Sequence, residues 1–167
     1  MRPESVPGPI LAALERHEVS FVLIGGLASV AHGSPIPTDD VDVTPEASRE
    51  NLGRLSNALR ELEAKVRAEG IDEGLPFSHD ADSLAAVGVW NLTTPYGHLD
   101  ISFVPTGTRG YPDLVEDAEP TQAYGVTVSI ASLADIIRSK QAANRPKDQR
   151  VLPVLREILA SRYQQRG

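Results

Sequence analysis

The chain has 167 residues, 41% hydrophobic and 23% charged, which is typical of one globular domain with a single core. It contains no cysteine, which excludes disulfides, thiolate metal sites and cysteine nucleophiles. Its net charge of −7 argues against a general nucleic-acid binder, and no apolar run approaches membrane-spanning length or forms a signal-peptide core, so we expect a cytoplasmic protein.

A helix and a strand are predicted at the start of the chain. Residues 9–16 show a helical apolar face, and residues 19–24 form a short run rich in β-forming residues that indicates a buried strand. Gly25 and Gly26 end this strand, and residues 27–32 form a single short helix. A strand that ends in glycines and opens a helix presents backbone N–H groups, and without a Cβ a phosphate can approach them closely.

The sequence Asp40-Val41-Asp42-Val43 alternates strictly between acidic and apolar residues, as a half-buried strand does. Asp40 and Asp42 therefore share one face of that strand, and Asp39 points to the opposite face. Two carboxylates beside a phosphate cradle call for a divalent cation. Taken alone, an Asp-x-Asp pattern is more often a solvated turn than a metal site.

Together these residues resemble the signature of the DNA polymerase β-like nucleotidyltransferase superfamily. The signature has an apolar residue, a Gly-Gly or Gly-Ser doublet, a spacer of about ten residues, and an acid-apolar-acid triplet; here Ile24, Gly25 and Gly26 precede Asp40-Val41-Asp42. Within the superfamily the chain looks most like the small bacterial group that includes AbiEii-type toxins. The doublet ends in Gly26 rather than the serine of many members. Whether another side chain, such as Ser29 or Ser34, holds the phosphates is therefore open.

The middle of the chain is predicted to hold a long helix, a loop and a hairpin. Apolar residues at helical spacing predict a helix over residues 47–68, with Gly70 as its C-cap; they are Leu52, Leu55, Leu59, Leu62 and Val66. Residues 71–83 are polar and interrupted by glycine and proline, so they are expected to be a surface loop. That loop carries three residues that invite a metal interpretation, although a surface position is the simpler one: His79, Asp80 and Asp82. The resemblance places such a loop near the substrate entrance.

Two β-rich runs, residues 86–92 and 99–104, flank Pro95-Tyr96-Gly97 and predict an antiparallel hairpin. Asp100 is an acid on an otherwise apolar strand, and an unpaired buried carboxylate is costly. The resemblance implies that Asp100 is the third catalytic carboxylate, on the strand beside Asp40 and Asp42. The alternative is an acid on an edge strand that faces water.

A short helix over residues 112–118 and a last strand over 126–130 precede a helix that is capped by Ser132 and runs to Ala143. Lys140 and Asp148 each lie on the apolar stripe of a C-terminal helix, which suggests that they pair. The pair either docks the two helices or places Lys140 on a triphosphate with Asp148 orienting it. The run from Ser139 to Asp148 resembles the C-terminal Lys…Arg-Pro-Lys-Asp signature of the superfamily, and this resemblance favours the ligand role and adds Lys147 to the nucleotide site.

The basic C-terminal segment has two interpretations. Residues 138–167 hold eight Lys or Arg and two acids, a balance of +6, whereas residues 1–137 carry a balance of −13. A basic end beside an acidic body could receive a polyanion, or its arginines could form a solvated helix face.

We expect an α/β (α+β) fold in which helices flank a mixed, mostly antiparallel sheet of four or five strands. A single domain spans residues 1–167, with a core over about 9–130 and C-terminal helices over about 131–163.

The resemblance implies a metal-dependent nucleotidyltransferase that moves NMP from an NTP to an acceptor. Two Mg²⁺ ions, or Mn²⁺, are then held by Asp40, Asp42 and Asp100, while Gly25, Gly26, Ser29, Lys140, Lys147 and Asp148 serve the nucleotide. The acceptor is open: an RNA 3′ end such as that of tRNA, a protein, or a small molecule such as an antibiotic. The resemblance also implies a toxin with an antitoxin partner, whereas neither DNA nor a membrane is expected as a partner. The alternatives are a degenerate module that binds without turnover and a metal-dependent phosphoesterase.

Overall fold

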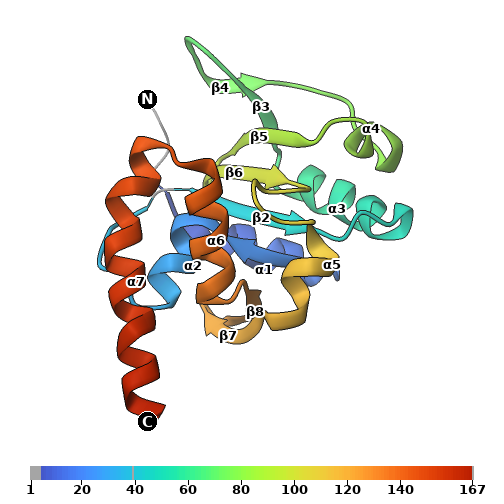
Figure 1. The fold of residues 1–167 in the computed structure, drawn as a ribbon. Helices are drawn as coiled ribbons and strands as arrows, with labels where there is room; N and C mark the ends of the chain where they lie inside the picture. The colour runs from blue at the N-terminus through green and yellow to red at the C-terminus, as the bar shows by residue number, and fades with distance from the viewer. Residues whose placement is uncertain (1–4, 39, 167) are drawn as a thin grey trace.

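The structure is a computed structural model, and it describes residues 5–38 and 40–166, so the expectation for Asp39 lies outside the described residues. Helices and strands alternate along much of the chain (Figure 1). The helices are α1 Pro7–Arg16, α2 Gly25–Ala31, α3 Arg49–Glu61, α4 Ala81–Ala85, α5 Tyr111–Leu114, the 3-10 turn η1 Val115–Asp117, α6 Leu133–Ala143 and α7 Pro146–Arg166. The strands are β1 Phe21–Ile24, β2 Val41–Pro45, β3 Lys65–Ala68, β4 Ile71–Leu75, β5 Val89–Thr94, β6 Gly97–Ser102, β7 Glu119–Ala123 and β8 Val126–Ile130.

The strands form one mixed sheet in the order β4-β3-β5-β6-β2-β1-β8-β7. Among the strands of the described residues, only the pairs β2–β6 and β1–β8 are parallel, and the other five pairs are antiparallel. The predicted mixed, mostly antiparallel sheet is therefore confirmed, as are the β5–β6 hairpin and the capping of α6 by Ser132, which accepts a hydrogen bond from the backbone of Asp135. The predicted count of four or five strands is wrong, because the described residues form eight.

The helix expected over residues 47–68 ends early. α3 stops at Glu61, and the chain turns at Glu63, whose φ of 52° is left-handed, before it enters β3. The last leucine at helical spacing is Leu62, which is 2% exposed, so the apolar face of the helix ends there. Gly70 is thus not a helix cap but part of the β3–β4 turn, with a φ of 79°.

The expected loop over residues 71–83 begins with a strand and ends with a helix. β4 pairs antiparallel with β3, and α4 starts at a capping box in which Asp80 and Ser83 exchange hydrogen bonds. Likewise β7, with the sequence Glu-Pro-Thr-Gln-Ala, was not predicted because it has no apolar stripe. Both β4 and β7 are edge strands, where polar residues meet water and a strand needs little apolar surface.

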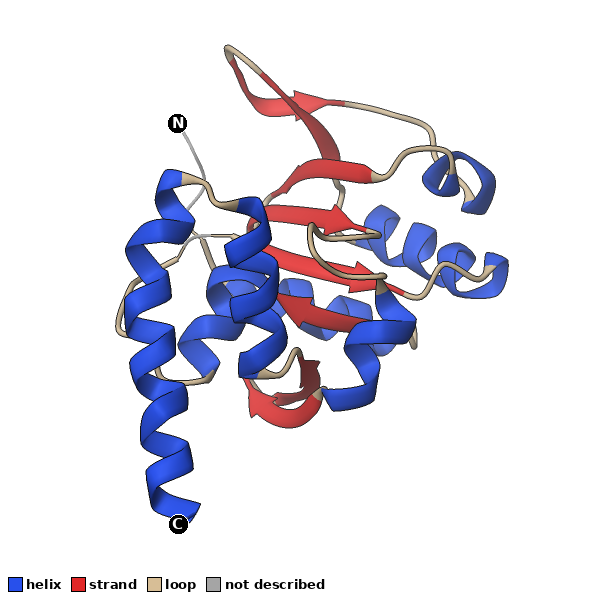
Figure 2. Cartoon of the chain, viewed as in Figure 1, coloured by secondary structure: helices blue, strands red, loops and turns tan. Residues whose placement is uncertain are grey.

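The core lies between the sheet and its helices. α1 and α3 lie behind the sheet in the view of Figures 1 and 2, α6 lies in front of it, and α7 stands beside α6 at the left. The largest fully buried side chains include Leu11 and Leu14 of α1 and Leu55 and Leu59 of α3, each with no exposed surface. Each such leucine contributes roughly 1.5–3 kcal/mol of transfer free energy. This packing fixes the central strands β1, β2 and β6, which carry the residues described next.

No helix within the described ranges combines the length and the apolar character that a membrane span requires.

Candidate active site

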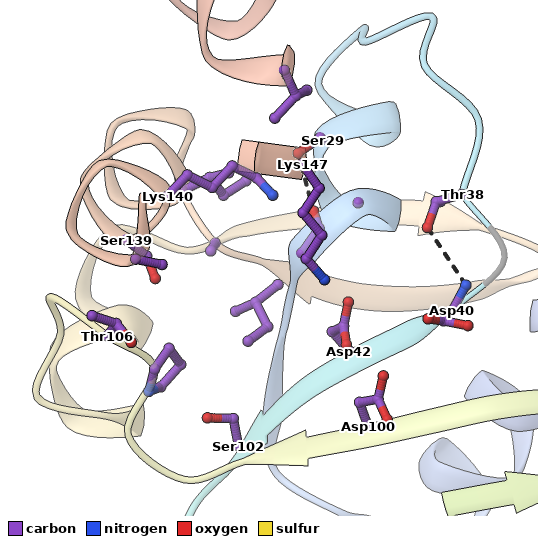
Figure 3. A pocket seen from close by; sticks show the side chains of 18 of the residues that line it. Ser29, Thr38, Asp40, Asp42, Asp100, Ser102, Thr106, Ser139, Lys140 and Lys147 are labelled. Carbon is purple, nitrogen blue, oxygen red and sulfur yellow. Dashed lines mark hydrogen bonds between the residues drawn. The ribbon is translucent and has the colours of Figure 1, made fainter. Parts of the chain in front are cut away.

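Two carboxylates are aligned by the register of the central strands. Asp42 of β2 lies directly opposite Asp100 of β6 in the parallel pair, and both side chains point into one cleft (Figure 3). The pKa of Asp42 is raised to about 7, first by burial, then by the charge of Asp100 and a hydrogen bond to it, and then by the charge of Asp40. Lys147 opposes this rise. Negative charge is thus concentrated where β2 meets β6.

Gly25 is required by the close approach of Asp42. A Cβ at position 25 would lie 2.2 Å from Asp42 Oδ2, and the φ of 71° is one that side-chain-bearing residues rarely adopt. The approach follows from the sheet, since Ile24 at the end of β1 pairs with Asp42. The backbone of Gly25, which follows Ile24, therefore lies directly against the Asp42 carboxylate.

Asp40 lies in the same cleft but is engaged by a histidine. Asp40 Oδ1 is 3.2 Å from Nδ1 of His98, which precedes Asp100 on β6 by two residues. Within residues 5–38 and 40–166, no three His, Cys, Asp or Glu side chains are grouped closely enough to hold one metal ion together. The cleft thus brings the three predicted acids together as one close pair, Asp42 and Asp100, and a third that is turned onto His98.

The donor set nevertheless fits a hard divalent cation. Mg²⁺ and Mn²⁺ prefer carboxylate oxygens, and Asp42 and Asp100 supply two on adjacent strands. Two charged carboxylates on adjacent strands repel each other, and after burial this repulsion is the next cause of the raised pKa of Asp42. A cation between them would relieve that repulsion.

Arg67 is a site residue that the sequence did not predict. Its guanidinium lies 2.7 Å from Asp100 Oδ1 and also donates to the carbonyl of Leu92 at 2.9 Å. Arg67 falls within the helix predicted over residues 47–68, but Lys65-Val-Arg-Ala alternates polar and small or apolar residues, which is the signal of a strand. Arg67 therefore reaches the cleft from β3 and neutralises part of its negative charge.

Lys140 and Asp148 form the expected ion pair, with Lys140 Nζ 3.8 Å from Asp148 Oδ1. Asp148 has no exposed surface, and its Oδ2 accepts from the backbone N–H of Arg145 at 3.0 Å and from Arg145 Nε at 2.8 Å. Burial raises the pKa of Asp148, but the Arg145 hydrogen bonds outweigh burial and leave it lowered. Asp148 thus holds the start of α7, and only Lys140 and Arg145 of this group line the cleft.

Burial lowers the pKa of Lys140, partly offset by the charges of Asp148 and Asp42. Lys147 stands at the first turn of α7 and points down toward Asp42 in Figure 3. Two lysines from two helices therefore face the acidic strands across the cleft.

The small residues of the β1–α2 junction and of the segment that follows α2 each contact a different partner. Ser29 is 1% exposed and donates its hydroxyl to the carbonyl of Gly25 at 3.0 Å. Ser34 is 5% exposed and accepts from the backbone N–H of Ile36 at 3.2 Å. Gly26 packs against Thr38, which the sequence did not single out. All of them line the cleft.

The cleft is a single hollow of about 1000 Å³ between the β1–α2 junction, β2, β6 and the helices α6 and α7. That volume is at the upper end of the range for small-molecule sites. His79 and Asp80 lie elsewhere in the described part of the chain: His79 Nδ1 is 2.7 Å from the Ser56 hydroxyl, and Asp80 caps α4.

Comparison with known proteins finds no matching family model and no match among curated proteins. Solved structures do match. The lincosamide antibiotic adenylyltransferase LnuA, bound to lincomycin, is 16% identical with a TM-score of 0.62, covering 93% of this chain and 99% of that one. The antibiotic-resistance factor ANT(2'')-Ia matches in two structures. Its complex with adenylyl-2''-tobramycin is 19% identical with a TM-score of 0.52, covering 93% and 95% of the two chains. Its solution structure is also 19% identical with a TM-score of 0.53, covering 94% and 90%.

The chain therefore has the nucleotidyltransferase fold over nearly its full described length. The predicted α/β architecture with a helical C-terminal end is confirmed by this likeness.

Proposed function

We propose that the protein is a metal-dependent nucleotidyltransferase that moves NMP from an NTP to a hydroxyl group of an acceptor. The observation that carries the proposal is the alignment of Asp42 with Asp100 on adjacent strands, with Gly25 packed against the Asp42 carboxylate. The nucleotidyltransferase fold supports it, since the acids lie on its central strands.

Asp42 and Asp100 would hold the metal. The Asp40 carboxylate would turn from His98 to the metal and become its third carboxylate ligand. Mg²⁺ or Mn²⁺ held there would supply positive charge to the phosphates and would lower the pKa of the attacking hydroxyl. Asp42, whose pKa of about 7 reflects burial and its acidic neighbours, would lose its shared proton when the cation binds.

The phosphates would lie between Gly25 and Gly26 on one side and Lys140 and Lys147 on the other. Both glycines and both lysines line the cleft. Asp148 is enclosed, so in this proposal it serves the nucleotide through Arg145 and Lys140, which it positions.

In the reaction the acceptor oxygen bonds to the α-phosphorus as the bond from that phosphorus to the β-phosphate oxygen breaks. Pyrophosphate leaves, and the proton of the hydroxyl passes to the carboxylates of the cleft. Lys140 and Lys147 offset the charge that develops on the leaving pyrophosphate.

For the acceptor we propose a small molecule rather than RNA. The cleft volume accommodates a nucleotide and one further small ligand, and the net charge of −7 disfavours a polyanion. Arg145, Lys147 and Arg150 of the basic C-terminal segment line the cleft, where an NTP would use them. The structural neighbours with bound lincomycin and adenylyl-tobramycin are consistent with this choice. A toxin that modifies RNA and has an antitoxin partner is the competing proposal.

The test is to incubate the protein with Mg²⁺ and each α-labelled NTP, alongside hydroxyl-bearing antibiotics in one set and total RNA in another. We expect label on a small molecule and release of pyrophosphate. Asp42→Asn should abolish transfer, and Asp82→Asn, the same change on exposed α4, should not.

Label on RNA would support the toxin interpretation instead. Release of inorganic phosphate without transfer would indicate a phosphoesterase, and NTP binding without turnover would indicate a binding module. Wild-type-like turnover by Asp42→Asn would refute the assignment of the site.

A further inference from the structure

Thr38 lies so close to Gly26 that it fills the position a side chain at residue 26 would take. A Cβ at position 26 would lie 2.7 Å from Thr38 Oγ1 and 2.9 Å from Thr38 Cβ, which is closer than real side chains approach. The backbone of Gly26 therefore passes directly against the Thr38 hydroxyl. Glycine at position 26 is explained by this contact and not by its backbone conformation, since Gly26 is not among the glycines with positive φ.

Among the described residues, Thr38 differs from Ser29 and Ser34 because its side chain is not fully buried and donates no hydrogen bond. Ser29 donates its proton to Gly25, and the Ser34 side chain is buried with its oxygen accepting from Ile36. Within the described residues, the Thr38 side chain makes only one hydrogen bond, a long one of 3.5 Å accepted from the backbone N–H of Asp40. A hydroxyl that accepts weakly still has a proton to donate.

The position of this hydroxyl is that of a ligand contact. Thr38 lines the cleft two residues before Asp40, and Figure 3 shows it across from Lys147 with Asp42 between and below them. Ligand atoms between Thr38 and Lys147 would be anionic, because an ammonium group and a hydroxyl donor both face them.

We propose that the Thr38 hydroxyl donates a hydrogen bond to a β- or γ-phosphate oxygen of the bound NTP, on the phosphates that Lys147 faces, and that glycine at position 26 makes room for Thr38. The inference rests on the proposed function and adds a substrate-binding residue that the glycine doublet and the acids do not include.

The first experiment measures dissociation constants for Mg–ATP and Mg–AMP by calorimetry. Thr38→Val removes the hydroxyl and keeps the branched shape, so binding of Mg–ATP should weaken about tenfold to a hundredfold, the loss of one hydrogen bond to a charged group. Binding of Mg–AMP should change less, since AMP lacks the β- and γ-phosphates. Thr38→Ser should restore Mg–ATP binding. Thr121→Val, the same change on β7 outside the cleft, is the matched control and should bind as the wild type does.

The outcomes separate the two proposals. If the wild type binds and uses Mg–ATP while Thr38→Val binds it equally well, the inference is wrong and the proposed function stands. If the wild type binds none of the four Mg–NTPs, the proposed function is wrong and the inference with it; if it binds another NTP in place of ATP, the same comparison is made with that NTP and its monophosphate.

A second experiment exchanges the two side chains. Gly26→Ser alone should lower the melting temperature, because its Cβ meets Thr38, and Thr38→Ala should relieve that loss. The double variant Gly26→Ser/Thr38→Ala replaces the hydroxyl of Thr38 by a serine hydroxyl that comes from residue 26. It should bind Mg–ATP more tightly than Thr38→Ala alone. A Gly26→Ser variant as stable as the wild type, or a double variant with no gain in binding, overturns the inference.

Discussion

Replacing Asp42 by asparagine should stabilise the metal-free protein, even though it should abolish activity. The pKa of Asp42 is about 7 in the folded chain, against an ordinary value of 3.8. The folded protein thus binds this proton more tightly than the unfolded chain does. Between these two pKa values the free energy of unfolding must fall as pH rises. Asparagine has the same shape and no charge, so it removes this penalty.

The magnitude follows from the shift. A difference of about 3 pKa units at about 1.36 kcal/mol each gives a penalty of about 4 kcal/mol at pH 8, where the folded carboxylate must ionise. At pH 5 the folded group keeps its proton and only the unfolded group has lost it, so the penalty is about 2 kcal/mol. The proton is shared with Asp100, so the penalty belongs to the pair.

The assay is thermal unfolding in EDTA at pH 5 and pH 8. For a chain of this size 1 kcal/mol shifts the melting temperature by about 3 °C, so Asp42→Asn should melt about 6 °C above the wild type at pH 5 and about 12 °C above it at pH 8. Mg²⁺ should narrow the gap at pH 8 by stabilising only the wild type. Asp82→Asn, on an exposed helix, should track the wild type at both pH values.

An Asp42→Asn variant that melts at or below the wild type at pH 8 would refute the reasoning. It would mean that the Asp42 carboxylate is already neutralised without metal, and that the repulsion from Asp100 is not present in solution.

Three further predictions concern the surrounding charges. Mg²⁺ affinity should rise between pH 6 and pH 8, because Mg²⁺ binding displaces the proton held with Asp42. Calorimetry in buffers of different ionisation enthalpy should detect the released proton. Mg²⁺ binding that does not depend on pH would contradict this prediction. Arg67→Met should lower the melting temperature in EDTA and tighten Mg²⁺ binding, since Arg67 competes with the cation for Asp100; weaker Mg²⁺ binding would show instead that Arg67 positions the carboxylate. Lys140→Met should weaken Mg–NTP binding with little change in melting temperature. Asp148→Ala should lower the free energy of unfolding by about 3–5 kcal/mol, because it removes the partner of buried donors and of a buried charge. A large loss of stability in Lys140→Met together with normal NTP binding would show that the pair is a salt bridge that docks the two helices.

The sequence predicted those parts of the fold and site whose signal is local. Alternation placed Asp42 on a strand, the turn at residues 95–97 fixed the hairpin, and a single acid on an apolar strand singled out Asp100. Cross-strand register then brings the two acids together, and no local pattern contains that register. Arg67 was missed for the same reason, because it reaches the site by the pairing of β3 with β5, three strands away from β2 in the sheet order.

The glycine doublet shows what a motif leaves unsaid. In the sequence Gly25 and Gly26 are equivalent, two residues without Cβ that let a phosphate approach. In the structure each makes room for a different polar side chain, Gly25 for the Asp42 carboxylate and Gly26 for the Thr38 hydroxyl. The two glycines are therefore expected to respond differently to the same substitution. Alanine at position 25 must displace the Asp42 carboxylate and adopt a strained φ, so no change at Thr38 can compensate for it. Alanine at position 26 meets only Thr38, so trimming Thr38 to alanine should restore the fold while leaving the phosphate without its hydroxyl partner.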